Sequence, residues 1–447
     1  MDFHAFQQAV AAEAAAQGIA DYELYYQVTE STSVSTFRQE INEFSDSNEG
    51  GVCLRCLIHG HMGYASTEQL SQSAAQALVR RAADNAAVLE TSEPEFLVAG
   101  GQSYQTLERP ARQLPAADAL IHAALEGQKA LYAQPGVVDG CGTQLEAAHT
   151  RIAISNSHGL ELAYENTVTV AFSEAIVEGD GEKTNDYAFT AAPLEELDLA
   201  DMAARAADNA RSKLGAGVAP TGAMPVVFAP RAMAQLLGTY AGVFSAENAQ
   251  KGLSLLKDRE GDTIASAAVT LVDDPFYAHS AMPIPFDAEG TPSYRKDVIE
   301  NGRLNTLLYN LRTAAAAGKA TTGNAAKAGY DGKVTVRPFT LYLAPGSCRE
   351  EELLQTAQNG VYITELGGLH AGANVISGDF SLQSAGFLIE NGSKGAPVRS
   401  FTVAGNFFDL LKGIEAVADR PEPPFSTGIT AYVSPSVLVR GLTIAGK

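Results

Sequence analysis

The sequence predicts an α+β protein, in which an N-terminal α/β unit is followed by a C-terminal domain with a large, mostly antiparallel or mixed β-sheet. Two observations predict this class. Helical and strand-like patterns alternate near the N-terminus, whereas strand and turn signals dominate beyond about residue 225. The length of 447 residues corresponds to about two to four domains. We predict domains at residues 1–110, 111–222 and 223–447.

The first 110 residues contain two predicted helices with two strands between them. Asp2 is the expected N-cap of the first helix, and Gly18 indicates its end. Ser66 and Gln69 have the spacing of a capping box, which predicts that an Ala-rich second helix begins there and continues to about Ala87. Alternation of apolar and polar residues predicts the strands, at residues 24–28 and 52–58.

The middle segment repeats this mixture of helices and strands. Helices are predicted at residues 115–131 and 197–214, the second ending at Gly215. Two alternating strands lie between them, at residues 150–155 and 160–175, and turn-forming residues separate them. Residues 215–225 are rich in Gly, Pro and Ala, which indicates a domain boundary.

Beyond this boundary the sequence predicts one helix and then mainly strands. Pro230 suits the first position of a helix that continues to about Phe244. Asn301-Gly302 and Asn391-Gly392 each lie between apolar runs, and this pair favours a type I′ hairpin turn because both residues adopt positive φ there. No fixed period recurs. We therefore predict that both hairpins belong to one large antiparallel sheet.

The charge balance restricts the partners of this chain. It has 52 acidic residues against 31 basic ones, for a formal charge of −21. Nucleic acids and anionic membrane surfaces attract basic proteins, so both are disfavoured. No apolar run reaches the roughly 18 residues of a membrane span, and the first residues lack the basic region of a signal peptide. Four cysteines are too few for a disulfide framework. We predict a cytoplasmic protein with no nucleic-acid or membrane partner.

The strongest metal-like motif combines Cys53, Cys56, His59 and His61. Zinc accepts such ligands in a tetrahedron. Side chains on a strand alternate between its two faces, however, so Cys56 points away from the face that the other three share. The four side chains cannot converge, and we predict strand packing here instead of a metal site.

Two loop sequences resemble ligand sites without matching them. Residues 321–329 are rich in Gly but lack the Gly-Lys-Ser/Thr ending of a P-loop, which predicts a loop or lid. Asp258, Glu260 and Asp262 carry ligands for a hard cation, but their order differs from that of an EF-hand. We predict a solvated acidic loop.

Hydrolase motifs are absent from the sequence. There is no G-x-S-x-G nucleophile elbow, and none of the eight histidines is followed by Glu or lies one helical turn from another. An H-E-x-x-H zinc helix is therefore excluded.

A set of specific motifs is distributed over nearly the whole chain. The motifs are residues 51–67, 247–252 (ENAQKG), 259–266 (REGDTIAS), 272–275 (VDDP), 378–381 (GDFS), 389–392 (IENG), 403–407 (VAGNF) and 434–436 (SPS). Through them the sequence is similar to the TldD/PmbA family, also described as modulators of DNA gyrase. The charge of −21 gives no physical support to a gyrase role.

The family has two types, and the metal ligands distinguish them. The TldD type has a His-Glu-x-x-x-His helix and a late cysteine as third ligand. The corresponding segment here is LLGTYAGVF at residues 236–244, residues 428–431 lie where the cysteine would be, and the last cysteine is Cys348. The chain therefore resembles the PmbA (TldE) type. This resemblance implies no catalytic residue, no metal ligand and no cofactor in this chain, with zinc held by a TldD-type partner.

The resemblance implies a heterodimer with a TldD-type catalytic subunit that degrades unfolded or extended peptides. Two other interpretations remain open. One is a homodimeric peptide-binding or adaptor protein without proteolytic activity. The other is an autonomous hydrolase that uses groups such as Asp273, Asp274 and His279.

A zinc-free subunit would contribute a wall of the substrate cleft and an edge to which the peptide adds as a strand. The candidate wall residues belong to one turn with exposed backbone groups, and they are Asn374, Ser377, Gly378, Asp379 and Ser381. The alternative is purely structural: Gly378 permits a tight turn, and Asp379 caps it.

Overall fold

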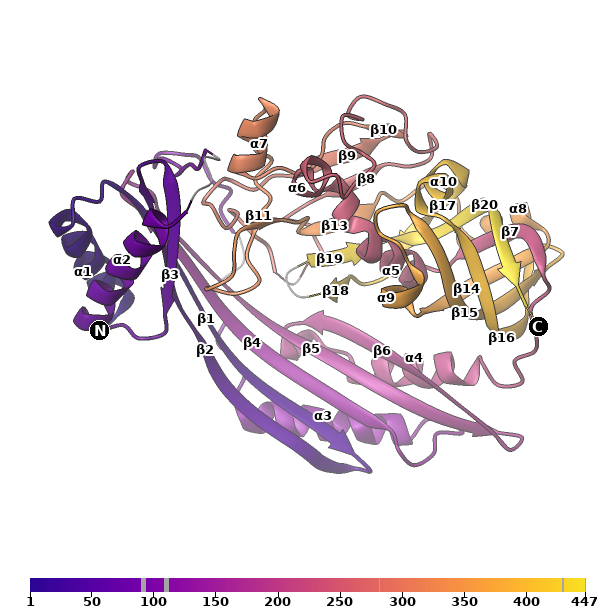
Figure 1. The fold of residues 1–447 in the computed structure, drawn as a ribbon. Helices are drawn as coiled ribbons and strands as arrows, with labels where there is room; N and C mark the ends of the chain where they lie inside the picture. The colour runs from indigo at the N-terminus through magenta and orange to yellow at the C-terminus, as the bar shows by residue number, and fades with distance from the viewer. Residues whose placement is uncertain (90–93, 108–111, 281, 428–429, 447) are drawn as a thin grey trace.

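The computed structural model describes residues 1–89, 94–107, 112–280, 282–427 and 430–446 and confirms the α+β class. This part of the chain contains three six-stranded sheets and one two-stranded ribbon (Figure 1). The first large sheet belongs to the N-terminal half, and the other two form the C-terminal half. The antiparallel and mixed sheets agree with the prediction.

The first sheet has the order β3-β2-β1-β4-β5-β6, and all its neighbours are antiparallel. Its strands are β1 (Asp21–Phe37), β2 (Glu40–Ile58), β3 (His61–Thr67), β4 (Gly142–Asn156), β5 (Glu161–Gly179) and β6 (Glu182–Ala192). Because β1 pairs with both β2 and β4, the sheet continues across residue 110. The division into domains 1–110, 111–222 and 223–447 stays a prediction.

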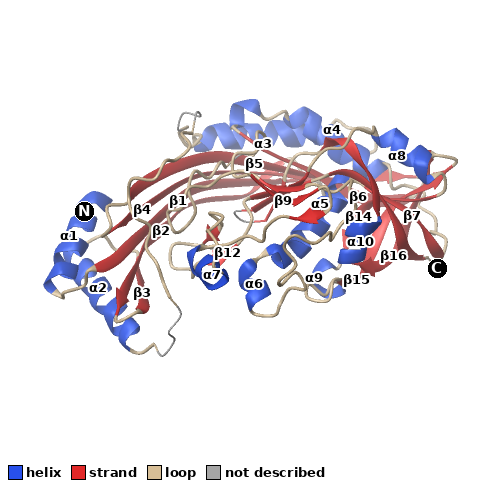
Figure 2. Ribbon diagram, turned by 90° about the horizontal axis from the view of Figure 1, so that it is seen from above, coloured by secondary structure: helices blue, strands red, loops and turns tan. Residues whose placement is uncertain are grey.

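Helices cover this sheet in two places. They are α1 (Phe3–Ala16), α2 (Gln72–Ala87), α3 (Ala117–Tyr132) and α4 (Leu199–Arg211). Figure 2 shows the long strands arching beside the C-terminal half, with α3 and α4 on the outer side of the arch. Alternate strand residues such as Val34, Leu145 and Ala171 are buried against these two helices, together with Leu120 and Met202. A fully buried Leu or Met of this kind contributes about 1.5–3 kcal/mol.

The structure corrects the start of the second helix. Asp2 caps α1 as predicted, because its carboxylate accepts the Ala5 N–H at 2.8 Å. The N-cap of α2 is Ser71, whose hydroxyl accepts the Ala74 N–H, and not Ser66. Ser66 lies on β3 opposite Cys53, so the sheet ladder determines its backbone conformation. Strand pairing, which the local pattern does not reveal, therefore overrode the capping-box spacing at Ser66.

The C-terminal half consists of two mixed sheets. One has the order β10-β9-β8-β13-β19-β18 and the other β16-β15-β14-β7-β20-β17, and each contains one parallel pair. The strands of the first are β8 (Leu271–Asp273), β9 (Lys296–Glu300), β10 (Arg303–Leu304), β13 (Thr340–Leu343), β18 (Phe425–Thr427) and β19 (Thr430–Val433). Those of the second are β7 (Gly222–Phe228), β14 (Gly360–Gly367), β15 (Asp379–Glu390), β16 (Ser393–Asn406), β17 (Ile414–Pro421) and β20 (Pro435–Ala445).

The two Asn-Gly hairpins form as predicted but in different sheets. Asn301-Gly302 joins β9 to β10 and Asn391-Gly392 joins β15 to β16, with positive φ at all four residues. The prediction of one common sheet was wrong. A turn sequence determines which two strands pair locally, but the further neighbours depend on packing around α5 (Pro230–Tyr240), which contacts strands of both sheets.

The short helix η1 (Leu194–Glu196) lies between β6 and α4. The other short elements complete the C-terminal half, and they are η2 (Ala241–Phe244), α6 (Ala246–Gln250), α7 (Leu311–Ala317), β11 (Ala325–Ala326), β12 (Thr335–Val336), α8 (Glu350–Ala357), α9 (Leu369–Gly372) and α10 (Phe407–Gly413). None of the helices in the described ranges combines the length and apolarity that crossing a membrane requires.

Candidate functional site

Helix α5 occupies the position expected for a metal-binding helix. Pro230 is at its first position, as predicted. Leu236, Leu237 and Tyr240 are buried in the C-terminal core. The Tyr240 ring stacks on Phe407 at 4.4 Å, and its hydroxyl donates to the Asp379 carbonyl oxygen at 3.0 Å. Burial, together with the nearby Asp379, raises the pKa of Tyr240 to about 12. This segment is apolar packing and presents no metal ligand.

The space between α5 and β19 is closed. A Cβ added to Gly238 would lie 3.1 Å from the Tyr432 ring. No group of three or more His, Cys, Asp or Glu residues is placed to hold a metal ion in the ranges that the structure describes. Residues 428–429, at the position of the third ligand in the family, lie outside those ranges. The residues around α5 therefore do not fit a zinc centre.

The five predicted cleft residues lie together in a turn and the start of the strand β15 that follows it. The Asn374 side-chain oxygen accepts the N–H groups of Ile376 and Ser377 at 3.0 and 3.1 Å. Gly378 has φ +86°, and an added Cβ would lie 2.7 Å from the Phe408 ring, so this position needs Gly. The turn leads into β15, on which Ser381 is exposed opposite Ala404.

The Asp379 carboxylate is exposed and accepts two side-chain hydrogen bonds. Asn406 donates from Nδ2 at 2.9 Å and Ser377 from its hydroxyl at 2.8 Å. These bonds, that from Asn406 first, lower the pKa of Asp379. Asn406 also caps α10. Asp379 therefore has a structural role in joining β15 to α10, whatever else it does.

A separate cavity of about 850 Å³ lies between the first sheet and the C-terminal half. One wall is formed by β5 and the end of β6, and the opposite wall by loops of the C-terminal half. Its lining includes residues 165–168 and 190–193 on the sheet side, and 277–280, 419–424 and 430–431 on the other side. The five turn residues of the previous paragraphs are not part of its lining. Charge or periodicity in the sequence does not indicate this cavity, because its walls are far apart along the chain.

One side-chain contact connects the two walls of this cavity, and others stabilise the wall on the sheet side. The Asn166 side chain on β5 donates to the Pro283 carbonyl oxygen at 3.0 Å. The Thr167 hydroxyl donates to the Arg112 carbonyl oxygen at 2.5 Å, and the Arg112 guanidinium pairs with Glu195 and Glu196 at 2.7 and 2.8 Å. The position of the cavity is therefore determined by specific polar contacts.

The residues proposed for an autonomous hydrolase do not form a reactive group. Asp273 is fully buried, and its carboxylate accepts hydrogen bonds from Lys296, Asn324 and the Phe339 N–H at 3.2, 2.7 and 2.8 Å. It is therefore inaccessible to a substrate. Apart from β11, residues 321–329 are irregular, as predicted for a loop, but the same contacts contradict a lid, since Asn324 is buried in the core.

Asp274 and His279 also make contacts that stabilise the local fold. The Asp274 carboxylate accepts the Phe276 N–H at 2.9 Å, which caps a turn. His279 is exposed at the cavity and contacts the Tyr277 ring edge-on, at 5.8 Å between centroids. Of the three groups, only His279 lines the cavity.

The acidic loop at Asp258–Asp262 is only partly solvated. Glu260 accepts the Leu307 N–H at 2.6 Å and the Tyr309 hydroxyl at 3.0 Å, and it pairs with Lys319. Asp262 is exposed and pairs with Arg259. The prediction of a solvated loop is wrong for Glu260, because this carboxylate connects the loop to the residues around α7.

The two cysteines of the Cys-His motif pack as strand geometry predicts, but the histidines do not share their strand: His59 lies in the turn after β2, and His61 begins β3. Cys56 is buried with residues of α1 and α2. Cys53 is buried in a different cluster with Tyr25 and Phe286. The two thiols therefore lie on opposite faces of β2.

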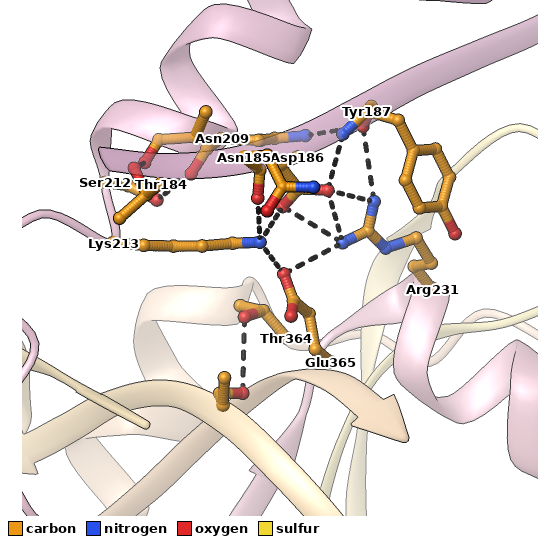
Figure 3. A network of polar contacts seen from close by, with 12 residues as sticks. Thr184, Asn185, Asp186, Tyr187, Asn209, Ser212, Lys213, Arg231, Thr364 and Glu365 are labelled. Atoms are coloured by element: carbon orange, nitrogen blue, oxygen red, sulfur yellow. Dashed lines mark hydrogen bonds and ion pairs between the residues drawn. The ribbon is translucent and has the colours of Figure 1, made fainter. Parts of the chain in front are cut away.

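A partly buried ionic network, with Asp186 at its centre, joins the middle segment to the C-terminal half (Figure 3). The Asp186 carboxylate on β6 accepts the Arg231 guanidinium at 3.2 Å and pairs with Lys213 at 3.0 Å. Glu365 on β14 pairs with the same two cations. Burial alone would raise the pKa of Asp186, but Arg231 and Lys213 outweigh it and the pKa is lowered. Burial raises the pKa of Glu365.

A second buried cluster joins β1 and β2 to the C-terminal half. Arg55 donates to Glu23 from Nε at 2.7 Å and lies 3.6 Å from Glu289, and all three side chains are at most 5% exposed. Asp287 lies in the same cluster and accepts three backbone N–H groups. Sequence reasoning missed both networks, because their members are scattered over the chain and no local pattern marks them.

Comparison with known proteins shows which family this sequence matches. Three family models match the chain: PmbA/TldA metallopeptidase domain 1 at residues 22–86, the central domain at 109–214 and the C-terminal domain at 221–446.

Two relatives come from one organism, Haemophilus influenzae. Its metalloprotease PmbA homolog is 27% identical over 402 residues (87% of this chain, 85% of the relative), and its metalloprotease TldD homolog is 28% identical over 240 residues (53% and 49%).

A solved Thermotoga maritima structure, named for modulation of a DNA gyrase, has a TM-score of 0.90 and 30% identity, and the match covers 99% of this chain and 100% of that one.

Proposed function

This chain belongs to the PmbA/TldD metallopeptidase family, and from that premise we propose that it is the non-catalytic, PmbA (TldE)-type subunit of a two-subunit zinc metalloprotease. The observation that carries the proposal is the packing of α5. Its apolar side chains are buried in the core, and Gly238 lies against Tyr432. A catalytic zinc needs about three protein ligands and an open position for water.

The partner in this proposal is a TldD-type subunit, which supplies the zinc. The presence of both a PmbA homolog and a TldD homolog in Haemophilus influenzae supports such a pairing. In this proposal the substrates are unfolded or extended peptides, and the two subunits act in the cytoplasm. Asn374, Ser377, Gly378, Asp379 and Ser381 are proposed to form part of the cleft wall. The exposure of Asn374, Asp379 and Ser381 supports this, whereas Ser377 is half-buried and Gly378 is buried.

The test measures bound zinc by elemental analysis and cleavage of an unfolded peptide, for the chain alone and mixed with a TldD-type subunit. The proposal expects no zinc and no cleavage alone, and cleavage on mixing. Stoichiometric zinc or turnover by the chain alone would overturn it. Peptide binding by a homodimer, without turnover on mixing, would favour the adaptor alternative.

The wall residues are tested separately in the reconstituted pair. Asp379→Ala and Ser381→Ala are expected to raise KM for the peptide while the pair still assembles. Unchanged turnover with both variants would remove the wall role and leave the subunit proposal intact.

A further inference from the structure

One half of β5 lacks a neighbouring strand on one side. β4 pairs with β5 from Glu161 to Glu174, whereas β6 pairs with it only from Thr169 to Gly179. The chain leaves the sheet after the Thr169–Ala192 pair, where Pro193 is the N-cap of η1. Residues 161–168 therefore have β4 on one side, and within the ranges that the structure describes they have no strand on the other, which we call the open edge.

The direction of the backbone groups on this edge follows from two turns. Asp180 and Gly181 have positive φ and form a two-residue hairpin turn, so Gly179 and Glu182 form a hydrogen-bonded pair. Odd-numbered residues of β5 then direct their N–H and C=O groups toward β6. The Asn156 N–H bond to the Leu160 carbonyl oxygen at 3.0 Å agrees, because it directs an even-numbered residue toward β4.

By the same alternation, Ala163, Glu165 and Thr167 direct their backbone groups away from β4, toward the open edge. Throughout the described ranges, no strand pairs with β5 there, and no backbone hydrogen bond to these three residues occurs outside the sheet. Unpaired edges of this kind are templates for an added strand.

The second half of the open edge, residues 165–168, lies against the cavity of about 850 Å³. Glu165–Val168 and the end of β6 both belong to the cavity lining, so the cavity continues the line of β6 past its last residue. A peptide strand in that space would run antiparallel to β5. The volume lies within the range of roughly 300–1,000 Å³ that is typical of ligand sites.

The charge of the cavity lining favours one kind of peptide. Four carboxylates, those of Glu165, Glu196, Asp419 and Glu422, belong to the lining, against the guanidinium groups of Arg112 and Arg420. Arg112 is already paired with Glu196. The whole chain carries −21, which adds a long-range attraction for cations. Acidic peptides are repelled by both terms.

We propose that residues 161–168 of β5 are a docking edge for an extended, basic peptide, which adds as a strand in line with β6. This inference deepens the proposed function, since it assigns part of the peptide to a particular site on this chain. It concerns peptide binding by the isolated chain, so it can hold even where reconstitution with a zinc subunit fails. Equally, reconstitution can succeed where this edge binds no peptide.

The test measures binding of a fluorescein-labelled peptide of alternating Val and Lys, about eight residues long, to the full chain by fluorescence anisotropy. Saturable binding is expected, and the same peptide with Glu in place of Lys should bind at least tenfold more weakly. N-methylation of one set of alternate residues should reduce affinity at least tenfold, whereas methylation of the other set should be tolerated. Equal effects of the two sets, or no binding at millimolar peptide, would overturn the proposal.

A protein variant tests the same edge from the other side. Glu165→Pro removes an N–H that points away from β4, and Glu165→Ala is the matched control because it loses the same charge. The Pro variant should bind at least tenfold more weakly than the Ala variant. Hydrogen exchange gives a second readout: peptide should protect the backbone amides of residues 161–168. Protection that depends only on protein concentration would mean that a second copy covers the edge, and the proposal would be wrong.

Discussion

Replacing Glu289 by Gln should remove most of the dependence of stability on pH between pH 6 and 8. Glu289 is buried beside Arg55, but Arg55 already donates to Glu23 at 2.7 Å and lies 3.6 Å from Glu289. The other bond to Glu289 comes from the Leu311 N–H at 2.9 Å. Burial raises the pKa of Glu289 to about 8, which Arg55 opposes and Asp287 reinforces. Glu289 is therefore the carboxyl group of the cluster whose burial is least offset by its polar contacts.

The sign follows from proton binding in the two states. Between pH 4.5 and about 8, the folded chain keeps a proton on Glu289 that the unfolded chain has released. The folded state binds more protons, so the free energy of unfolding falls as pH rises through this window. Over the two pH units from 6 to 8 the loss is up to about 3 kcal/mol. Burial also raises the pKa of Asp287, to about 6, so this carboxyl is already half ionised at pH 6 and contributes less than Glu289 to the slope over this range.

The assay is thermal and urea unfolding of the native chain and of Glu289→Gln at pH 6, 7 and 8. The native chain should lose stability over this range, and the variant should lose much less. Glu30→Gln is the control, since Glu30 is exposed on β1 and should leave the slope unchanged. A variant slope equal to the native slope would show that Glu289 is ionised in the folded chain, and the reasoning about the cluster would be wrong.

Three further substitutions test the packing around the site, each by thermal unfolding. Arg231→Leu leaves Asp186 with one cation and should lower the free energy of unfolding by about 3–5 kcal/mol. The control Arg205→Leu breaks an exposed pair and should lower it by less than about 1 kcal/mol. Equal losses in the two variants would contradict the importance of the network. Gly378→Ala should cost about 1–3 kcal/mol, and more than Gly252→Ala, where an added Cβ meets nothing within 4 Å; a silent Gly378→Ala would refute the clash. Tyr240→Phe removes the bond to the Asp379 carbonyl and should cost about 0.5–1.5 kcal/mol, and no loss would show that the bond is not formed.

The fold class and many local elements could be predicted from the sequence. Asp2 caps α1 and Pro230 begins α5 as expected, and both Asn-Gly turns have the predicted positive φ. These features depend on residues within a few positions of each other, so a local pattern is sufficient. Ser66 is the informative failure, because pairing of β3 with β2 overrode its capping spacing.

Some features of the candidate site could likewise be predicted from the sequence, and others could not. The absence of zinc ligands on the segment at 236–244 is visible in the sequence, and the five turn residues of the predicted wall lie together because they are close along the chain. The cavity was not predicted, since its walls come from residues about 165 and about 420. No periodicity connects positions that far apart.

The sequence by itself determined several helices and strands, the two hairpin turns and the absence of His, Cys, Asp and Glu from residues 236–244, because these follow from neighbouring residues and from which residue types are present. Only the tertiary structure decided which sheet each hairpin joins, which carboxylate shares Arg55, and where β6 ends beside β5. These depend on packing between distant segments, where burial changes the energy of a charge and one strand's length leaves its neighbour's edge open.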